Sequence, residues 1–271
     1  MENEKSVYPK RIVTQLFNDN FQNFKRYNIP KAQLVIADIP YNLGVNAYAS
    51  SNEWYIDGDN KKGESSKAGK QFFYTDCNFN IAEYMHFCNR LLKKEPKEKG
   101  AAPAMIVFCS FQQIPLVIQY GGKYGFKHNI PLVFVKNTSA QVLKANMKVV
   151  GATEYGLILY RDKLPKFNNG GRMIKNWFIM QRDNRKIYPK IHPTQKPVGL
   201  LKDLIRIFTD EGDVVIDPCA GSGTTLRAAM ELGRNSYGFE ISKEFCRKAR
   251  EQMLVVESDG QQISFFDGRQ G

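Results

Sequence analysis

The tetrapeptide Asp38-Ile39-Pro40-Tyr41 joins a carboxylate, a stiffened turn and an aromatic ring in consecutive residues. It follows the apolar run 34–37, which has the length of a buried strand, and doubly wound sheets bind ligands at the carboxyl ends of their strands. The Asp38 carboxylate and the Ile39 carbonyl could accept the hydrogens of an exocyclic amine, a poor nucleophile when it is conjugated into a purine. Tyr41 offers a ring on which an extruded base could stack, and Pro40 stiffens the turn. Taken alone, the tetrapeptide is also typical of an ordinary strand-ending turn.

A second segment, Asp217-Pro218-Cys219-Ala220-Gly221-Ser222-Gly223-Thr224-Thr225, follows the apolar run 214–216 and leads into a helical pattern. Gly221 and Gly223 permit a tight turn and close approach of a ligand, and Glu240, 17 residues after Gly223, suits a ribose diol. This context predicts an adenosine-containing cofactor. The segment is not a dinucleotide fingerprint, because GxGxxG is not completed, and it lacks the Gly-Lys-Ser/Thr of a P-loop. The alternative is a glycine turn that only packs a strand against a helix, with Cys219 as a small packing residue.

The elements that must position these segments alternate between strands and helices. Short apolar runs predict strands at 34–37, 105–109, 132–135, 157–160, 214–216 and 237–239. Helical periodicity covers 196–209, a second helix follows Gly223, and Ser242 is placed to cap a third. This alternation predicts an α/β fold with a doubly wound, mostly parallel sheet.

Together the motifs resemble a known family. Asp38–Tyr41 is similar to the catalytic motif of the DNA amino-methyltransferases, and 217–225 is similar to their cofactor motif. The segment His192-Pro193-Thr194-Gln195-Lys196-Pro197 resembles their third signature. Because the catalytic motif precedes the cofactor motif, the order is that of the permuted beta group of adenine-N6 and cytosine-N4 enzymes. The resemblance covers about residues 30–255.

The resemblance implies an S-adenosylmethionine-dependent methyltransferase fold, base flipping, and direct methyl transfer that leaves S-adenosylhomocysteine. It implies that Asp217 lies near the methionine part of the cofactor, that Glu240 holds the ribose, and that Thr194 and Lys196 lie near the cofactor carboxylate. The full set of cofactor residues expected is Asp217, Cys219, Gly221, Ser222, Gly223, Thr224, Glu240, Thr194 and Lys196. Asp38 at the first motif position favours adenine N6 over cytosine N4. Two departures are Ile39, where proline is commoner, and Cys219, where a larger apolar residue is frequent.

The charge points to a polyanionic partner. The 271 residues include 39 Lys and Arg against 27 Asp and Glu, a net charge of +12 that suits double-stranded DNA. Two segments, 45–75 and 161–190, read as long surface loops, and the second contains nine Lys or Arg residues. The DNA-binding candidates in them are Lys61, Lys62, Arg172, Lys175, Arg182 and Arg185, with Lys67, Lys70 and Lys186 as further candidates. Each such charge could equally belong to a solvated face.

The last residues form a separate region. We expect a methyltransferase domain over 1–257 and a flexible tail over 258–271. Within the tail, Gln262, Ile263, Phe265 and Phe266 resemble the short peptide with which bacterial replication proteins bind the sliding clamp. The alternative is a final edge strand that packs Ile263 and Phe265 on the core. A homodimer is a further expectation.

Other features limit the protein class. Five scattered cysteines and three histidines lack metal-ligand spacing, so no metal site or disulfide framework is expected. No apolar run approaches the roughly 18 residues of a membrane span, and the polar N-terminus is unlike a secretory signal, which predicts a cytoplasmic, nucleoid-associated protein of bacterial or phage origin. The rival functions are a cytosine-N4 enzyme, an RNA or protein methyltransferase, and a non-catalytic nucleic-acid-binding subunit. A role in restriction and modification is one of several settings left open.

Overall fold

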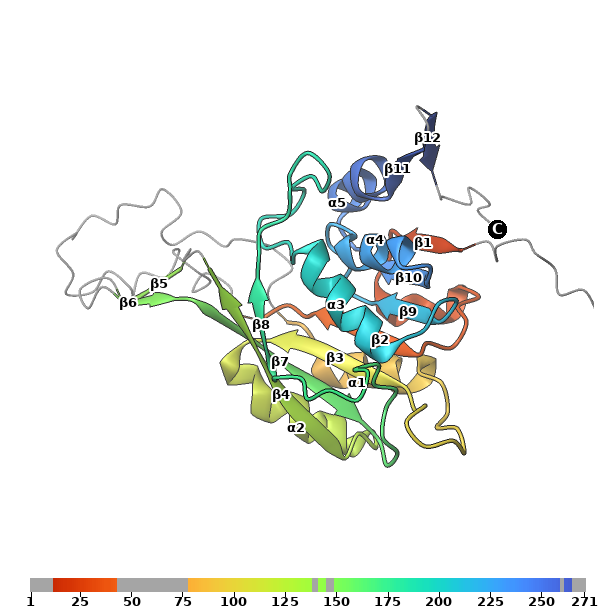
Figure 1. Ribbon diagram of the computed structural model, residues 1–271, viewed down its shortest axis with the longest axis vertical. Coiled ribbons are helices and arrows are strands. Elements are labelled where there is room, and N and C mark those ends of the chain that lie inside the picture. Colours follow the sequence, from red (N-terminus) through yellow and green to blue (C-terminus); the bar gives the residue numbers. More distant parts are fainter. Residues whose placement is uncertain (1–11, 43–77, 138–140, 145–148, 259–260, 265–271) are drawn as a thin grey trace, which may run out of the picture.

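The computed structural model describes residues 12–42, 78–137, 141–144, 149–258 and 261–264, and its centre is an eight-stranded sheet (Figure 1). In order across the sheet, the strands are β1 (Thr14–Phe17), β10 (Asn235–Phe239), β9 (Val214–Asp217), β2 (Leu34–Asp38), β3 (Ala104–Cys109), β7 (Thr153–Tyr160), β4 (His128–Lys136) and β8 (Trp177–Met180). Among these described strands, β7 alone runs antiparallel to its neighbours. The predicted doubly wound, mostly parallel sheet is confirmed.

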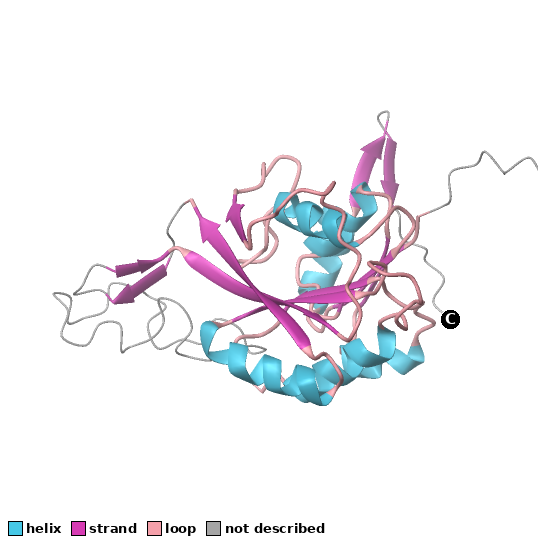
Figure 2. Cartoon of the chain, turned by 60° about the horizontal axis from the view of Figure 1, so that its bottom comes forward, coloured by secondary structure: helices cyan, strands magenta, loops and turns pink. Residues whose placement is uncertain are grey.

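Helices cover both faces of this sheet (Figure 2). On one face lie α1 (Ile81–Leu91) and α2 (Ile114–Lys123), and on the other lie α3 (Val198–Phe208) and α4 (Thr224–Glu231). Strand β2 shows why its sequence is a continuous apolar run: Val35 and Ala37 pack in the α1 cluster, whereas Leu34 and Ile36 pack in the α3 cluster. A sheet buried on both faces needs apolar residues at every position of its central strands.

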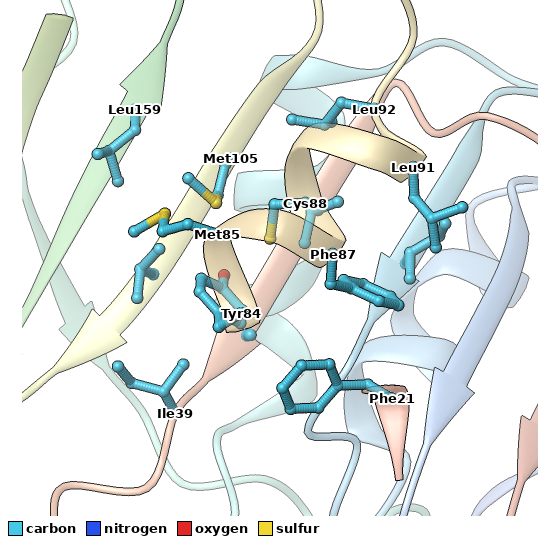
Figure 3. Packing of buried hydrophobic residues seen from close by; sticks show 14 of the residues in the cluster. Phe21, Ile39, Tyr84, Met85, Phe87, Cys88, Leu91, Leu92, Met105 and Leu159 are labelled. Atoms are coloured by element: carbon cyan, nitrogen blue, oxygen red, sulfur yellow. The ribbon is translucent and has the colours of Figure 1, made fainter. Parts of the chain in front are cut away.

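The α1 face anchors the start of the predicted catalytic turn. Asn80 caps α1, because its side chain accepts hydrogen bonds from the backbone N–H groups of residues 82 and 83. From this helix Tyr84, Met85 and Phe87 pack toward β3 and Phe21 (Figure 3). Ile39 is buried in the same cluster. The departure from proline at this position therefore gives the turn an apolar anchor in the core.

Several parts of the chain differ from expectation. Strand β8 lies inside 161–190, so the prediction of one uninterrupted loop there is wrong for Trp177–Met180. This strand forms the edge of the sheet, and the basic residues around it concealed its apolar run. Strand β1 and helices α1 and α2 were not among the predicted elements. A small separate sheet joins β5 (Gln141–Lys144) and β6 (Val149–Gly151).

The C-terminal region begins as a hairpin. After α5 (Lys243–Lys248), strand β11 (Val255–Ser258) pairs antiparallel with β12 (Gln261–Ser264), apart from the main sheet (Figure 1). The expected tail boundary at 257/258 thus falls within β11. The alternative, a final edge strand, appears as β12, but this strand pairs with β11 and does not join the main sheet. Among the described residues, no helix combines the length and apolar character that crossing a bilayer requires.

Candidate active site

The three predicted motifs meet at one edge of the sheet. Strands β2, β9 and β10 are parallel neighbours, so their carboxyl ends lie side by side although the first is far from the others in sequence. A cavity of about 670 Å³ opens at this edge. The predicted residues that line it are Asp38, Ile39, Pro40, Tyr41, Thr194, Lys196, Asp217, Cys219, Gly221, Ser222, Thr224 and Glu240. Gly223 is not in this lining, and a side chain added there would face Ala249 and Leu254 instead.

The glycine turn between β9 and α4 is closed by a hydrogen bond within the turn and tied to the neighbouring strand β10 by another. Gly221 and Gly223 have φ angles of 52° and 77°, in the left-handed region that favours glycine. The Gly223 N–H donates to the Ala220 carbonyl (2.8 Å), and the Ala220 N–H donates to the Phe239 carbonyl of β10 (2.8 Å). At Gly221, which lines the cavity, the backbone can therefore approach a ligand closely.

Two carboxyl groups of this wall are unusually basic. Burial raises the pKa of Asp217 to about 7, even though the Thr225 hydroxyl and the Cys219 N–H (2.9 Å) donate to it. Burial also raises the pKa of Glu240 to about 7, against a hydrogen bond from the Ser242 N–H (2.7 Å). The charges of Asp38 and Glu240 add to the rise at Asp217. Several carboxylates thus crowd one cavity, which favours a ligand that brings positive charge.

The catalytic turn is held by hydrogen bonds from two sides. The Tyr41 hydroxyl donates to Asp38 Oδ1 (3.2 Å), and the Ile39 N–H donates to the Phe108 carbonyl of β3 (3.2 Å). Beyond Tyr41, Asn42 has a φ of 56°, and its side chain exchanges two hydrogen bonds with the Phe79 backbone (2.8 and 3.1 Å). The carboxylate and the ring are therefore positioned by the chain on both sides of the turn.

Gln113 is a site residue that sequence reasoning missed. Its Nε2 donates to the Pro40 carbonyl (2.9 Å), and its Oε1 accepts from the Ser110 N–H (3.1 Å). The Gln113 side chain is buried. The signal in the sequence is the spacing Ser110-x-x-Gln113 directly after a strand, which is the pattern of a capping box. Gln113 ties the catalytic turn to the end of β3.

Lys196 contacts the catalytic turn. Its ammonium nitrogen lies 2.5 Å from Asp38 Oδ2 and 3.0 Å from Glu154 Oε2. Lys136 of β4 pairs with the other Glu154 oxygen (2.6 Å). Sequence reasoning missed Glu154 and Lys136. The role near the cofactor carboxylate that the resemblance implies for Lys196 stays a prediction.

The segment before α3 closes another side of the cavity. The His192 ring packs on Phe245, with 4.6 Å between centroids, and its Nδ1 lies 3.1 Å from the Thr194 hydroxyl oxygen. Burial, followed by the Lys196 charge, lowers the pKa of His192 to about 4. His192 is therefore neutral at physiological pH and orients Thr194 without adding charge.

The basic candidates in 161–190 are exposed, and one part of this segment is anchored near the cavity. Arg172, Lys175, Arg182 and Arg185 all lie on the surface. Asp183, next to Arg182, accepts the first N–H of α3 through both carboxylate oxygens (2.9 and 3.0 Å). The start of α3 directly follows the residues that line the cavity. Lys61, Lys62, Lys67 and Lys70 lie outside the described residues.

Comparison with known sequences gives a consistent result. A family model for N6 and N4 methyltransferases, described as DNA methylase, matches residues 32–251. The DNA adenine methyltransferase YhdJ of Escherichia coli (strain K12) is 28% identical across 93% of this chain and 86% of its own length. The type II methyltransferase M2.LlaDCHI of Lactococcus lactis subsp. cremoris is 34% identical across 92% of both proteins.

Solved structures share the fold. The M1.HpyAVI–SAM complex aligns with a TM-score of 0.61 and 22% identity, covering 88% of this chain and 97% of that chain. The PvuII DNA methyltransferase, which is cytosine-N4-specific, aligns with a TM-score of 0.60 and 16% identity, covering 88% and 86%. At these identities the likeness concerns the architecture of the sheet and helices.

Proposed function

Because the chain belongs to the N6/N4 DNA methylase family, we propose that it transfers a methyl group from S-adenosylmethionine to adenine N6 in double-stranded DNA. One observation carries the proposal. The Asp38 carboxylate and the Tyr41 ring line the same cavity as the glycine turn and Glu240. An acceptor for an amine and a wall for an adenosine cofactor therefore share one space.

The cavity fits S-adenosylmethionine in size and charge. Its volume of about 670 Å³ lies within the roughly 300–1,000 Å³ of small-molecule sites. Glu240 would accept hydrogen bonds from the ribose hydroxyls, and Asp217 would face the methionine part. The backbone of the glycine turn, with Cys219, Ser222 and Thr224, would border the cofactor. Thr194 and Lys196 remain candidates for its carboxylate.

When bound, the cofactor supplies an electrophilic methyl group on a sulfonium. The chain's own residues prepare the acceptor. Asp38 Oδ1 and the Ile39 carbonyl would accept the two amine hydrogens, which favours a pyramidal nitrogen with its lone pair aimed at the methyl carbon. Tyr41 would stack on the flipped base. Asp38 would take up the proton that the amine releases when it accepts the methyl group.

The choice of adenine rests on Asp38 and on relatives. Asp at the first motif position resembles the adenine enzymes, and YhdJ carries the name of a DNA adenine methyltransferase. The PvuII enzyme has a similar fold and is cytosine-N4-specific, so cytosine N4 is the alternative. Both reactions place the same demand on Asp38, since both targets are exocyclic amines.

DNA would be held by basic side chains near the cavity. We expect Arg172, Lys175, Arg182 and Arg185 mainly to contact phosphates. Reversing these charges together should weaken binding to all sequences alike and flatten its salt dependence. If the charge-reversed variant bound DNA as tightly as wild type at both low and high salt, this assignment would be rejected.

Contacts with a sliding clamp and homodimer formation also remain proposals. Gln262 and Ile263 lie in β12, whereas Phe265 and Phe266 lie outside the described residues. Deleting 261–271 should abolish binding to the bacterial clamp while leaving methyl transfer to DNA intact. If the full chain and the truncated chain bound the clamp equally well, clamp binding through these residues would be refuted.

The activity is tested by offering methyl-labelled S-adenosylmethionine together with duplex DNA, structured RNA or a protein mixture. We expect label in duplex DNA, and no label when Asp38→Ala is used. The variant should still bind the cofactor, since the glycine turn and Glu240 are unchanged. Label in RNA or protein alone, or in none of the three, would contradict the proposed substrate.

A further inference from the structure

A row of alternating charges runs from β4 to the catalytic turn. It consists of Lys136, Glu154 of β7, Lys196 and Asp38, and neighbouring nitrogen and oxygen atoms lie 2.6, 3.0 and 2.5 Å apart. Exposure of these four side chains ranges from 7% for Lys196 to 28% for Asp38. Placing four charged groups away from water is costly. Ion pairs of this kind are weak evidence for stability, so a role in the site is the better explanation.

The sheet explains how Lys196 reaches two carboxylates. Phe108 of β3 pairs with Asp38 on one side and with Gly156 of β7 on the other. The Lys196 ammonium lies 5.2 Å from the centre of the Phe108 ring. It therefore crosses over β3 and bridges β2 to β7. Glu154 holds it there from the strand that runs antiparallel.

We propose that Glu154 and Lys196 are positioning residues for Asp38: Glu154 holds the Lys196 ammonium across β3, and that ammonium favours the ionised form of the Asp38 carboxylate. Lys196 occupies Oδ2, while Oδ1 accepts from Tyr41 and is the oxygen left for the base amine. This inference rests on the proposed function, in which Asp38 must be an acceptor. A protonated Asp38 would present a donor to the amine and lose that role.

Electrostatics support this division of roles. Burial raises the pKa of Asp38 above its ordinary value; the Lys196 ammonium limits this rise, and the Glu154 charge adds to it. Burial also acts to raise the pKa of Glu154, but Lys196 and Lys136 hold that pKa at about 2. Among the described residues, the other titratable groups around this cavity are Tyr41 on the turn itself, Cys109 of β3, Asp217 and Cys219 after β9, Glu240 after β10, and His192 before α3. None of them supplies Asp38 with a second ammonium.

Two substitutions should move the acid limb of the pH–rate profile in opposite directions. Lys196→Met removes the ammonium and leaves two facing carboxylates, so the limb should move up by about one pH unit or more. Glu154→Gln keeps an amide oxygen that can accept from the Lys196 ammonium and removes only the negative charge that raises the Asp38 pKa, so the limb should move down. Lys196→Arg keeps the positive charge, so its acid limb should lie at the same pH as in wild type. Lys127→Met, at an exposed ion pair with Asp162, is the matched control and should leave it unchanged.

The profile is measured at saturating DNA and cofactor. The inference would be overturned if Lys196→Met and Glu154→Gln lowered the rate equally at every pH, or if the acid limb of both variants lay at the wild-type pH. The second measurement needs no turnover: carboxyl-carbon NMR titration of Asp38, assigned with Asp38→Asn, should show the same two opposite shifts. If wild-type protein methylated no DNA, the proposed function would fail, while this titration would still confirm or refute the charge row. Glu154→Gln is nearly isosteric and keeps the test available should Lys196→Met not fold.

Discussion

Raising the pH from 6 to 8 should strengthen cofactor binding through Glu240. Burial raises the pKa of this carboxyl to about 7, whereas an unperturbed glutamate titrates near pH 4.3. It is therefore mostly protonated at pH 6 and mostly ionised at pH 8. A ribose diol donates hydrogen bonds, and an ionised carboxylate is the stronger acceptor.

The magnitude follows from the fraction that is ionised. A group with a pKa of about 7 is about one tenth ionised at pH 6 and about nine tenths ionised at pH 8, so a ligand that needs the ionised form gains about tenfold in affinity, or about 1.4 kcal/mol. Asp217, with a pKa also about 7, adds a dependence of the same sign if its charge faces the sulfonium. Each group should release a proton on binding.

Isothermal titration calorimetry with S-adenosylmethionine, in wild type and in Glu240→Gln, isolates the contribution of Glu240. The ratio of the two affinities cancels the titration of the ligand's own amino group, which lies near pH 8. This ratio should rise about tenfold between pH 6 and 8, and wild type should release more protons than the variant. A ratio that is flat across this range would refute the role of Glu240 and the physical reasoning behind it.

Three further predictions concern the supports of the site. Gln113→Leu should lower kcat by about tenfold to a hundredfold with an unchanged cofactor Kd, because the Pro40 carbonyl loses its donor and the turn shifts; single-turnover kinetics checks this. Gly223→Ala should cost about 1–2 kcal/mol of folding free energy and weaken cofactor binding. Gly170→Ala also changes a glycine at positive φ, but in open space, so it should lower stability without affecting cofactor binding. Denaturant unfolding measures the stability of both variants, and calorimetry measures their cofactor binding. Asp183→Ala should cost about 1 kcal/mol in thermal unfolding, because α3 loses the acceptor of its first N–H, while Asp203→Ala, at an exposed ion pair, should have little effect.

Much of the fold followed from local patterns. The apolar runs at 34–37 and 214–216 became β2 and β9, and Ser242 caps α5 by accepting from the Phe245 N–H, as predicted. Parallel pairing then brought Asp38 to the same edge as Asp217. Local patterns did not predict β1, α1 or α2, nor β8, whose apolar run lies among basic residues.

The supports of the site depend on long-range pairing. Glu154 precedes an apolar run and looks like an ordinary strand residue in the sequence. Its contact with Lys196 exists because β7 lies beside β3 in antiparallel register, which no local pattern specifies. The capping-box spacing of Gln113 is visible in the sequence. Its hydrogen bond to the Pro40 carbonyl, however, also requires β2 and β3 to be neighbours. Motifs thus identify residues that face ligands, while their supports come from topology.

We propose that Asp38 and the cofactor wall act together on an adenine amine in one cavity. The most direct test is the nucleoside product. Unmethylated genomic DNA is incubated with S-adenosylmethionine and wild type or Asp38→Ala, digested to nucleosides and analysed by mass. We expect N6-methyladenine with wild type and none with the variant. N4-methylcytosine would overturn the base assignment, and N6-methyladenine formed equally well by Asp38→Ala would contradict the mechanism.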